Sequence, residues 1–285
     1  MKKALSLILA LALALSIAAC GTSGKPAETP AAPSETMEPS PSSTPEESAP
    51  FPEASDLFIS AAASLAQPLD ELAALYNEKV GPKVRIIVNY GGSGALQTQI
   101  ENGSPADLFL SAAAKQMDAL QDKGLVDTAT RVDLLKNDIV LIVPATAGIS
   151  LDSFEDAAAG AVGSIALGDP ESVPAGQYAK EVFTSLGLWE AVQARAVFAS
   201  DVKQVLSWVA TGNADCGVVY KTDAVSESGV KIAAAAPEGS HKEVIYPAAV
   251  LATAENRAAA LSFLEFLQTD EALGVFERYG FTVNR

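Results

Sequence analysis

Histidine and cysteine are scarce in this chain of 285 residues, which contains one histidine, His241, and two cysteines, Cys20 and Cys216. Most zinc sites need three or four such ligands, so a metal held as a free cation is not expected. Every histidine-dependent catalytic triad would have to use His241. Cys216 lies in the apolar run 215–220, where a small buried side chain is expected instead of a reactive thiol.

Positive charge is also in short supply. The chain has 19 Lys and Arg against 35 Asp and Glu, and its formal net charge is −16. Proteins that bind nucleic acid usually present a basic patch, and the sequence contains no cluster of Lys and Arg. Nucleic acid is therefore excluded as a partner.

The N-terminus has the pattern of an export signal. Lys2 and Lys3 precede an apolar segment from 5 to 17, and two alanines then stand directly before Cys20. A transmembrane helix is the alternative, but the segment is short and lacks a stop-transfer cluster of charges. Residues 1–19 resemble the signal peptide of bacterial lipoproteins, which implies that Cys20 is acylated after cleavage.

Residues 20–55 are predicted to form a tether. The segment holds eight of the 16 prolines, many Ser and Thr, and almost no bulky apolar residue. Such a composition cannot bury enough surface to offset the loss of chain entropy. Cys216 is then the only cysteine of the folded part, so no disulfide is expected within it.

From residue 56 onward, strand and helix patterns alternate, which predicts an α/β fold with parallel sheets covered by helices. Hydrophobic residues make up 49% of the chain, and its length favours two lobes. Strands are expected at 57–61, 84–90, 107–111, 139–143, 164–167, 197–199, 215–220 and 230–235. Helices are expected from 65 to the stop at 81–82, near 95–103, and at 113–122, 175–186 and 201–210, with a mostly helical part after 247.

Several strand-to-helix junctions carry a small or hydroxyl residue where the helix begins: Ser64, Ser93, Ala175 and the pair Asp201-Val202. Helix N-termini offer free backbone N–H groups, and in α/β sheets ligands bind at the carboxyl ends of strands, where such junctions gather. None of these residues is a Lys or Arg. The pattern predicts a small anion held by neutral hydrogen bonds.

Two other interpretations of these serines stay open. Ser64 and Ser93 could each be a helix N-cap, which is the commonest role of serine at such places. The run Gly91-x-Ser93-x-Ala95 also has part of the G-x-S-x-G pattern of a serine hydrolase, but its last glycine is missing and only His241 could act as the base. No Gly-Lys-Ser/Thr follows, as a phosphate-binding P-loop would require.

Seven sequence strings resemble the molybdate-binding proteins of bacterial ABC importers. They are spread over nearly all of 57–285: SAAASLAQPL, SPADLFLSA, LGDPESVPAGQYAKE, SDVKQVLSWV, GVVYKTDAV, GSHKEVIYPAAV and RYGFT. The resemblance implies a two-lobed type II periplasmic binding protein fold, each lobe a mainly parallel sheet flanked by helices, with the ligand in the cleft. Lobe 1 is expected to comprise 56–137 and 247–285, and lobe 2 138–246, with hinges near Asp138 and Tyr246-Pro247.

The resemblance also implies the binding residues. Members of the family hold their oxyanion with two serine hydroxyls, a tyrosine hydroxyl and backbone amides. The matching positions are Ser64, Ser93, Ala175, Val202 and Tyr220. Where the family often has a serine-rich run, this chain has Gly91-Gly92-Ser93-Gly94, so only Ser93 supplies a hydroxyl there.

The expected function is that of a solute-binding lipoprotein, exported and lipid-anchored at the outer face of the cell membrane. It would capture molybdate or tungstate and deliver it to the permease and ATPase subunits of an ABC importer, as a monomer without a cofactor and without enzymatic activity. A carrier for another tetrahedral oxyanion such as sulfate, or a serine hydrolase, are the alternatives.

Overall fold

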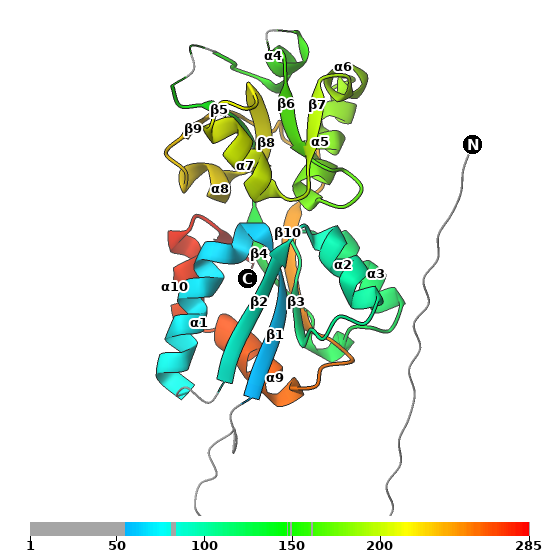
Figure 1. Ribbon diagram of the computed structural model, residues 1–285, viewed down its shortest axis with the longest axis vertical. Coiled ribbons are helices and arrows are strands. Elements are labelled where there is room, and N and C mark those ends of the chain that lie inside the picture. Colours follow the sequence, from blue (N-terminus) through cyan, green and yellow to red (C-terminus); the bar gives the residue numbers. More distant parts are fainter. Residues whose placement is uncertain (1–54, 81–83, 147, 149, 161, 285) are drawn as a thin grey trace, which may run out of the picture. The chain divides into compact units, whose positions relative to one another are not determined.

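A computed structural model describes residues 55–80, 84–146, 148, 150–160 and 162–284, all within one compact unit of the chain. These residues form two β-sheets flanked by helices (Figure 1). The expected signal peptide 1–19, Cys20 and the rest of the tether lie outside the described residues, except Ser55, which begins the first strand. No helix in the described part is long and apolar enough to cross a membrane.

The first sheet and the helices that pack on it are called lobe 1. Its strands are β1 (Ser55–Ala62), β2 (Val84–Gly91), β3 (Leu108–Leu110), β4 (Val132–Asn137), β10 (Val244–Val250) and β11 (Thr282–Val283). They are ordered β11-β4-β10-β3-β1-β2. β1 pairs in parallel with β2 and β3, whereas the pairs β10–β3, β10–β4 and β11–β4 are antiparallel.

Helices cover both faces of this sheet, because its central strands alternate apolar side chains between two cores. Leu108 and Leu110 belong to the larger core with α1, α9 and α10, whereas Phe109 belongs to a smaller core with α2 and α3. Figure 1 shows these two groups of helices on either side of the strands. The helices of lobe 1 are α1 (Ala66–Val80), α2 (Ser93–Glu101), α3 (Ala114–Asp122), α9 (Arg257–Leu267) and α10 (Asp270–Arg278), with the short 3-10 helices η1 (Ala63–Leu65) and η2 (Thr128–Thr130).

The second sheet and its helices are called lobe 2. Its strands are β5 (Ile139–Pro144), β6 (Ile165–Gly168), β7 (Ala196–Ala199), β8 (Cys216–Tyr220) and β9 (Val230–Ala235), in the order β7-β6-β8-β5-β9. Its helices are α4 (Phe154–Ala158), α5 (Pro174–Ser185), α6 (Trp189–Gln193), α7 (Val202–Ala210) and α8 (Lys221–Val225). α5 and α7 pack against the central strands β6 and β8.

The expected α/β class and two-lobed fold are confirmed, but the expectation of mainly parallel sheets is wrong. β6 pairs in parallel with β7 and β8, yet β5 pairs antiparallel with β8 and β9, so both sheets are mixed. The physical reason lies in the connections between the lobes. The chain passes straight from β4 of lobe 1 to β5 of lobe 2 and later from β9 back to β10, so β5 begins opposite the end of β8 and β10 runs back along β3 from its end.

Three strands of the lobe 1 sheet were not predicted from the sequence: β4, β10 and the two-residue β11. β4 has only two fully buried residues, Leu134 and Leu135, and so carries little hydrophobic pattern. β10 contains Pro247, which argues against a strand, but a register shift between Tyr246 and Pro247 accommodates it. β10 joins the lobe 1 sheet from Val244, three residues ahead of the expected boundary at 247, and the exact division of the chain into lobes stays a prediction.

Candidate functional site

Three chain segments of lobe 1 and three of lobe 2 meet around a small pocket. All five residues predicted from the sequence line it, each from a different one of these six segments, and Ala112 supplies the sixth. The full lining is Ala62, Ala63, Ser64, Gly91, Gly92, Ser93, Ala112, Val173, Pro174, Ala175, Val202 and Tyr220. None of these residues carries a charge, so the pocket can offer a ligand only neutral groups.

The hydroxyl of Ser64 belongs to a chain of hydrogen bonds behind the pocket. Its Oγ lies 2.9 Å from the phenolic oxygen of Tyr246. Asn137 donates through Nδ2 to that same phenolic oxygen at 3.3 Å. Tyr246 can therefore use its one proton to donate to Ser64, and this arrangement leaves the proton of Ser64 free for a ligand.

The hydroxyl of Ser93 is held in a similar way. Ser93 is the first residue of α2, and its Oγ accepts a hydrogen bond of 3.0 Å from the backbone N–H of Ala112. Because the oxygen is already used as an acceptor, its proton is available to donate into the pocket. Ser64 and Ser93 thus both line the pocket, and each can donate its proton to a ligand.

The interpretation of these serines as helix caps is wrong. The N-cap of η1 is Ala62 and that of α2 is Gly92, and neither helix has a side-chain cap. Asp201 shows the contrast, since it caps α7 by accepting a 3.0 Å hydrogen bond from the N–H of Gln204. The buried serine hydroxyls therefore do not cap the N-termini of their helices.

Tyr220 brings a phenol to the pocket from the end of β8. Its hydroxyl lies 3.5 Å from the carbonyl oxygen of Ala112, at the limit of a hydrogen bond, and its ring packs edge-on against Tyr246 at 5.6 Å. Burial raises the pKa of both phenols well above the ordinary value of 10. Both tyrosines therefore stay protonated at physiological pH, and Tyr220 can donate to a ligand.

Two helices of lobe 2, α5 and α7, begin at residues that line the pocket. α5 begins at Pro174, which has no N–H, so Ala175 supplies the first amide of that helix. α7 begins at Val202. Amides in the first turn have no acceptor within their own helix and lie at the positive end of the helix dipole. Both termini therefore favour an anion.

An ion pair joins α7, which begins at Val202, to α8, the helix that follows Tyr220. The Nζ of Lys203 lies 2.8 Å from the Oδ1 of Asp223, which is buried in α8. Burial raises the pKa of Asp223, and the ammonium of Lys203 opposes that shift. The carboxylate of Asp223 neutralises the charge of Lys203, so Lys203 does not act as a counterion for an anion in the pocket.

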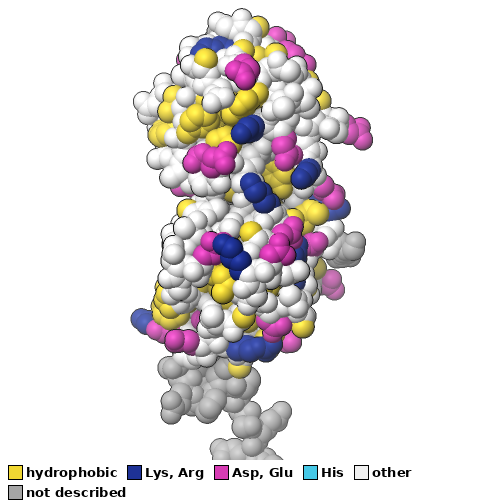
Figure 2. All heavy atoms as spheres, turned by 90° about the vertical axis from the view of Figure 1, so that its right-hand side faces the viewer, with side chains coloured by type: hydrophobic (Ala, Val, Ile, Leu, Met, Phe, Trp, Pro, Cys, Tyr) yellow, Lys and Arg dark blue, Asp and Glu magenta, His cyan; other side chains and the backbone are white. Residues whose placement is uncertain are grey.

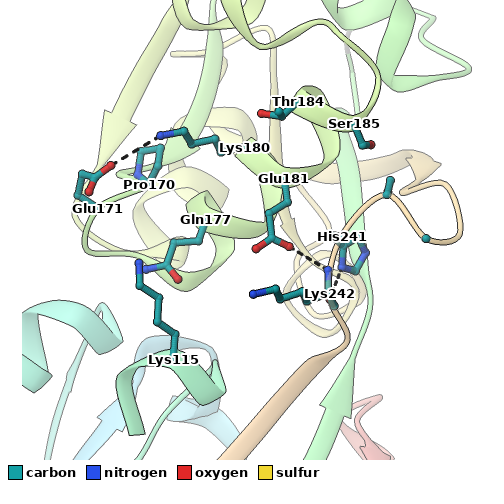
Figure 3. Close-up of a pocket in the computed structure, with 12 residues that line it drawn as sticks. Lys115, Pro170, Glu171, Gln177, Lys180, Glu181, Thr184, Ser185, His241 and Lys242 are labelled. Atoms are coloured by element: carbon teal, nitrogen blue, oxygen red, sulfur yellow. Dashed lines mark hydrogen bonds and ion pairs between the residues drawn. The ribbon is translucent and has the colours of Figure 1, made fainter. Parts of the chain in front are cut away.

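A larger open groove lies beside this pocket and is chemically different. Lys115 of lobe 1 faces Lys180, Glu181 and Lys242 of lobe 2 across it (Figure 3). Lys180 pairs with Glu171 at 3.7 Å, and Glu181 accepts a 2.9 Å hydrogen bond from the backbone of Lys242. On the face shown in Figure 2, Lys and Arg are likewise interspersed with Asp and Glu. This mixture of donors and acceptors does not select for a ligand that has only acceptors.

The only histidine of the chain lies in this groove and not in the pocket. The Nδ1 of His241 is 2.6 Å from the carbonyl oxygen of Lys242, and its ring packs edge-on against Tyr178. Ser93, the candidate nucleophile, instead contacts Ala112 in the pocket. The structure therefore does not bring together the serine and histidine that a hydrolase would need.

Other candidates for chemistry are also accounted for within the described residues. No group of three His, Cys, Asp or Glu side chains is placed there to hold a metal ion. Cys216 is buried, and burial raises the pKa of its thiol to about 12, as expected for an unreactive cysteine.

The sequence did not predict the residues whose hydrogen bonds position the pocket serines. Tyr246 was predicted only as part of a hinge, and Asn137 and Ala112 were not singled out. Tyr246 contacts Ser64 across 182 positions of the chain. A tyrosine directly before a proline in an apolar run is the one local signal that could have suggested it.

Comparison with known proteins gives consistent results. Residues 57–282 match the family described as bacterial extracellular solute-binding protein. A protein of Bacillus subtilis strain 168, provisionally named as the ABC transporter substrate-binding lipoprotein YvgL, is 46% identical over 79% of this chain and 86% of its own. The molybdate-binding protein ModA of Escherichia coli K12 is 40% identical over 80% of this chain and 89% of its own. The solved structure of the periplasmic molybdate-binding protein of Azotobacter vinelandii shares the fold, with a TM-score of 0.72 at 24% identity, over 80% of this chain and all of that one.

Proposed function

The chain belongs to the bacterial extracellular solute-binding proteins, and on that premise we propose that it binds molybdate or tungstate in the pocket between its lobes and delivers the oxyanion to an ABC importer. The name of the 40% identical relative supports molybdate as the ligand. In this role the protein is a carrier and has no enzymatic activity or cofactor. Ser64, Ser93 and Tyr220 would donate their hydroxyls, and Ala175 and Val202 their backbone amides.

The observation that carries the proposal is that the pocket is built from donors whose own oxygens are already engaged. Ser93 accepts from Ala112, and Ser64 lies within hydrogen-bond distance of Tyr246. A molybdate ion is a tetrahedral dianion at neutral pH and presents only acceptors. Donors fixed in this way match it on several sides, with two helix N-termini adding the favourable dipole.

The same inventory explains how other anions would be refused. A protonated phosphate carries an O–H that needs an acceptor, which a pocket lined mainly by donors matches poorly, and a buried unpaired O–H costs about 1–3 kcal/mol. Sulfate, like molybdate, has only acceptors, so size must exclude it. Sulfur–oxygen bonds are shorter than molybdenum–oxygen bonds, and a cavity fitted to molybdate leaves some donors out of reach of sulfate.

Neutral donors also suit a protein that must release its cargo. A buried Arg or Lys in the pocket would lose its counterion when the oxyanion left, and an uncompensated buried charge is strongly destabilising. The lining of this pocket has no such residue. Release to a permease therefore leaves behind only hydroxyl and amide groups, which water can satisfy.

Membrane attachment is part of the same proposal. Acylation of Cys20 would anchor the exported protein at the outer face of the cell membrane, with residues 21–55 as the tether to a monomeric binding domain. The pattern of residues 1–20 supports this, and so does the lipoprotein name of the 46% identical relative. The permease and ATPase subunits of the importer would be its partners.

A thermal-shift panel tests the proposed ligand. At concentrations of about 100 to 1,000 times Kd, a ligand of the native state stabilises by about 2.7–4.1 kcal/mol. For a domain of this size, that corresponds to a rise in Tm of about 5–15 °C. We expect this rise with molybdate and tungstate and no rise with equal concentrations of phosphate. A larger rise with phosphate, sulfate or an amino acid would overturn the assignment.

A further inference from the structure

The two lobes touch directly at the rim of the pocket, through the glycines at the N-terminus of α2. The backbone N–H of Gly94 in lobe 1 donates a 2.8 Å hydrogen bond to the carbonyl oxygen of Ser172 in lobe 2. Ser172 is the residue before the pocket-lining segment Val173–Ala175. The contact thus joins the loop that carries Ser93 to the start of α5.

No side chain could fit at this contact. A Cβ on Gly94 would lie 2.6 Å from the carbonyl oxygen of Ser172 and 2.8 Å from its Cα. A Cβ on Gly92 would lie 2.7 Å from the carbonyl oxygen of Ser200 and 3.2 Å from Val173 Cγ2. Separations below 3.0 Å do not occur for real Cβ atoms, and the closest atoms here belong to the backbone of lobe 2.

The backbone of lobe 2 is held firmly at these points. The N–H of Ser172 donates to the carbonyl oxygen of Asp169 at 3.1 Å, and its hydroxyl donates to the Asp169 carboxylate at 3.0 Å. The N–H of Ser200 donates to the side chain of Gln204 at 2.8 Å. Neither carbonyl can move aside without breaking such bonds, so an added methyl group would have to push the lobes apart.

Neither glycine is required by its backbone conformation. The glycines with positive φ lie elsewhere in the described chain, and Gly92 has φ −63° as the N-cap of α2. Gly94 lies in the first turn of α2, where alanine is the better helix former. The close approach of lobe 2, and not the backbone conformation, is therefore what requires glycine at both positions.

We propose that Gly92 and Gly94 are closure residues, whose missing side chains allow the lobes to dock on the carbonyls of Ser172 and Ser200 and so enclose the bound oxyanion. This inference rests on the proposed function. A methyl group at Gly94 penalises only the state in which the lobes touch. The open, ligand-free state has no such contact to lose, so the cost falls on ligand affinity.

The test is a calorimetric titration of Gly94→Ala with molybdate, beside the native chain and Gly274→Ala. Gly274 is the matched control, because it also lies in a helix and its added Cβ would meet no atom within 4 Å. Overpacking of a fitted contact predicts at least about tenfold weaker binding for Gly94→Ala, with faster ligand dissociation. Its ligand-free Tm should stay equal to or above that of the native chain, and Gly274→Ala should bind normally.

The outcomes separate the two proposals. If the native chain gives no binding heat with molybdate or tungstate, the proposed function fails. If the native chain binds and Gly94→Ala binds within a factor of two of it, the closure proposal is wrong and the proposed function stands. Should Gly94→Ala fail to fold, Gly92→Ala in the neighbouring contact with Ser200 replaces it, and the same criterion applies to its affinity.

Discussion

The double variant Ser64→Ala/Ser93→Ala is expected to bind molybdate about 100- to 10,000-fold more weakly than the native chain. Each substitution removes one hydroxyl donor to a dianion, and a charge-assisted hydrogen bond contributes about 1.5–3 kcal/mol. That range corresponds to about a tenfold to hundredfold loss of molybdate affinity for each of the single variants Ser64→Ala, Ser93→Ala and Tyr220→Phe. Calorimetric titration of the single and double variants measures the losses and shows how far they add.

Stability separates a binding serine from a purely structural one. Ser93→Ala also leaves the buried N–H of Ala112 without its acceptor, so its Tm should fall together with its affinity. Ser111 is the matched control. Its buried hydroxyl donates to the carbonyl oxygen of Ala113 at 2.8 Å and is not part of the pocket lining. Ser111→Ala should lower Tm and keep molybdate affinity. Normal affinity in the double variant would show that the serines do not hold the ligand.

Cys20→Ala is expected to move the exported protein almost completely from the membrane fraction to the soluble fraction, without a change in molybdate affinity. Without an acyl chain, only the tether and the binding domain remain, with a formal net charge of −18 because Lys2 and Lys3 leave with the signal peptide, and such a chain is not attracted to an anionic lipid surface. Fractionation of cells and immunoblotting measure the distribution.

Cys216→Ala serves as the control for this variant, because Cys216 is the other cysteine of the chain and is buried in β8. It should stay with the membrane like the native protein. A Cys20→Ala protein that is cleaved after its signal sequence and still sediments with the membrane would contradict the lipid anchor.

The local elements of the fold could be predicted well from the sequence. Leu65, Leu69, Leu72 and Tyr76 follow helical spacing, and all four are buried along η1 and α1. The convergence of the four junctions at Ser64, Ser93, Ala175 and Val202 on one pocket could also be anticipated, since helix N-termini and strand ends gather at the same edge of an α/β sheet. That Ser64, Ser93, Ala175, Val202 and Tyr220 bind an oxyanion remains a prediction.

What could not be predicted depends on contacts distant in sequence. β10 runs antiparallel to its neighbours β3 and β4, which are distant in sequence. Pro247 also argues against predicting a strand there from the sequence. The roles of the two serines follow from Tyr246 and Ala112, which are 182 and 19 positions away. A serine before a helical pattern has the same local sequence whether it caps the helix or faces a ligand, so only the fold distinguishes the two.

The most direct test of the central claim is a crystal structure of the protein with molybdate, in which anomalous scattering at the molybdenum absorption edge locates the ion. The account predicts one strong peak in the pocket, with oxyanion oxygens within hydrogen-bond distance of Ser64 Oγ, Ser93 Oγ and the hydroxyl of Tyr220. A peak located instead in the groove lined by Lys115, Lys180 and Lys242, or no peak between the lobes, would contradict it.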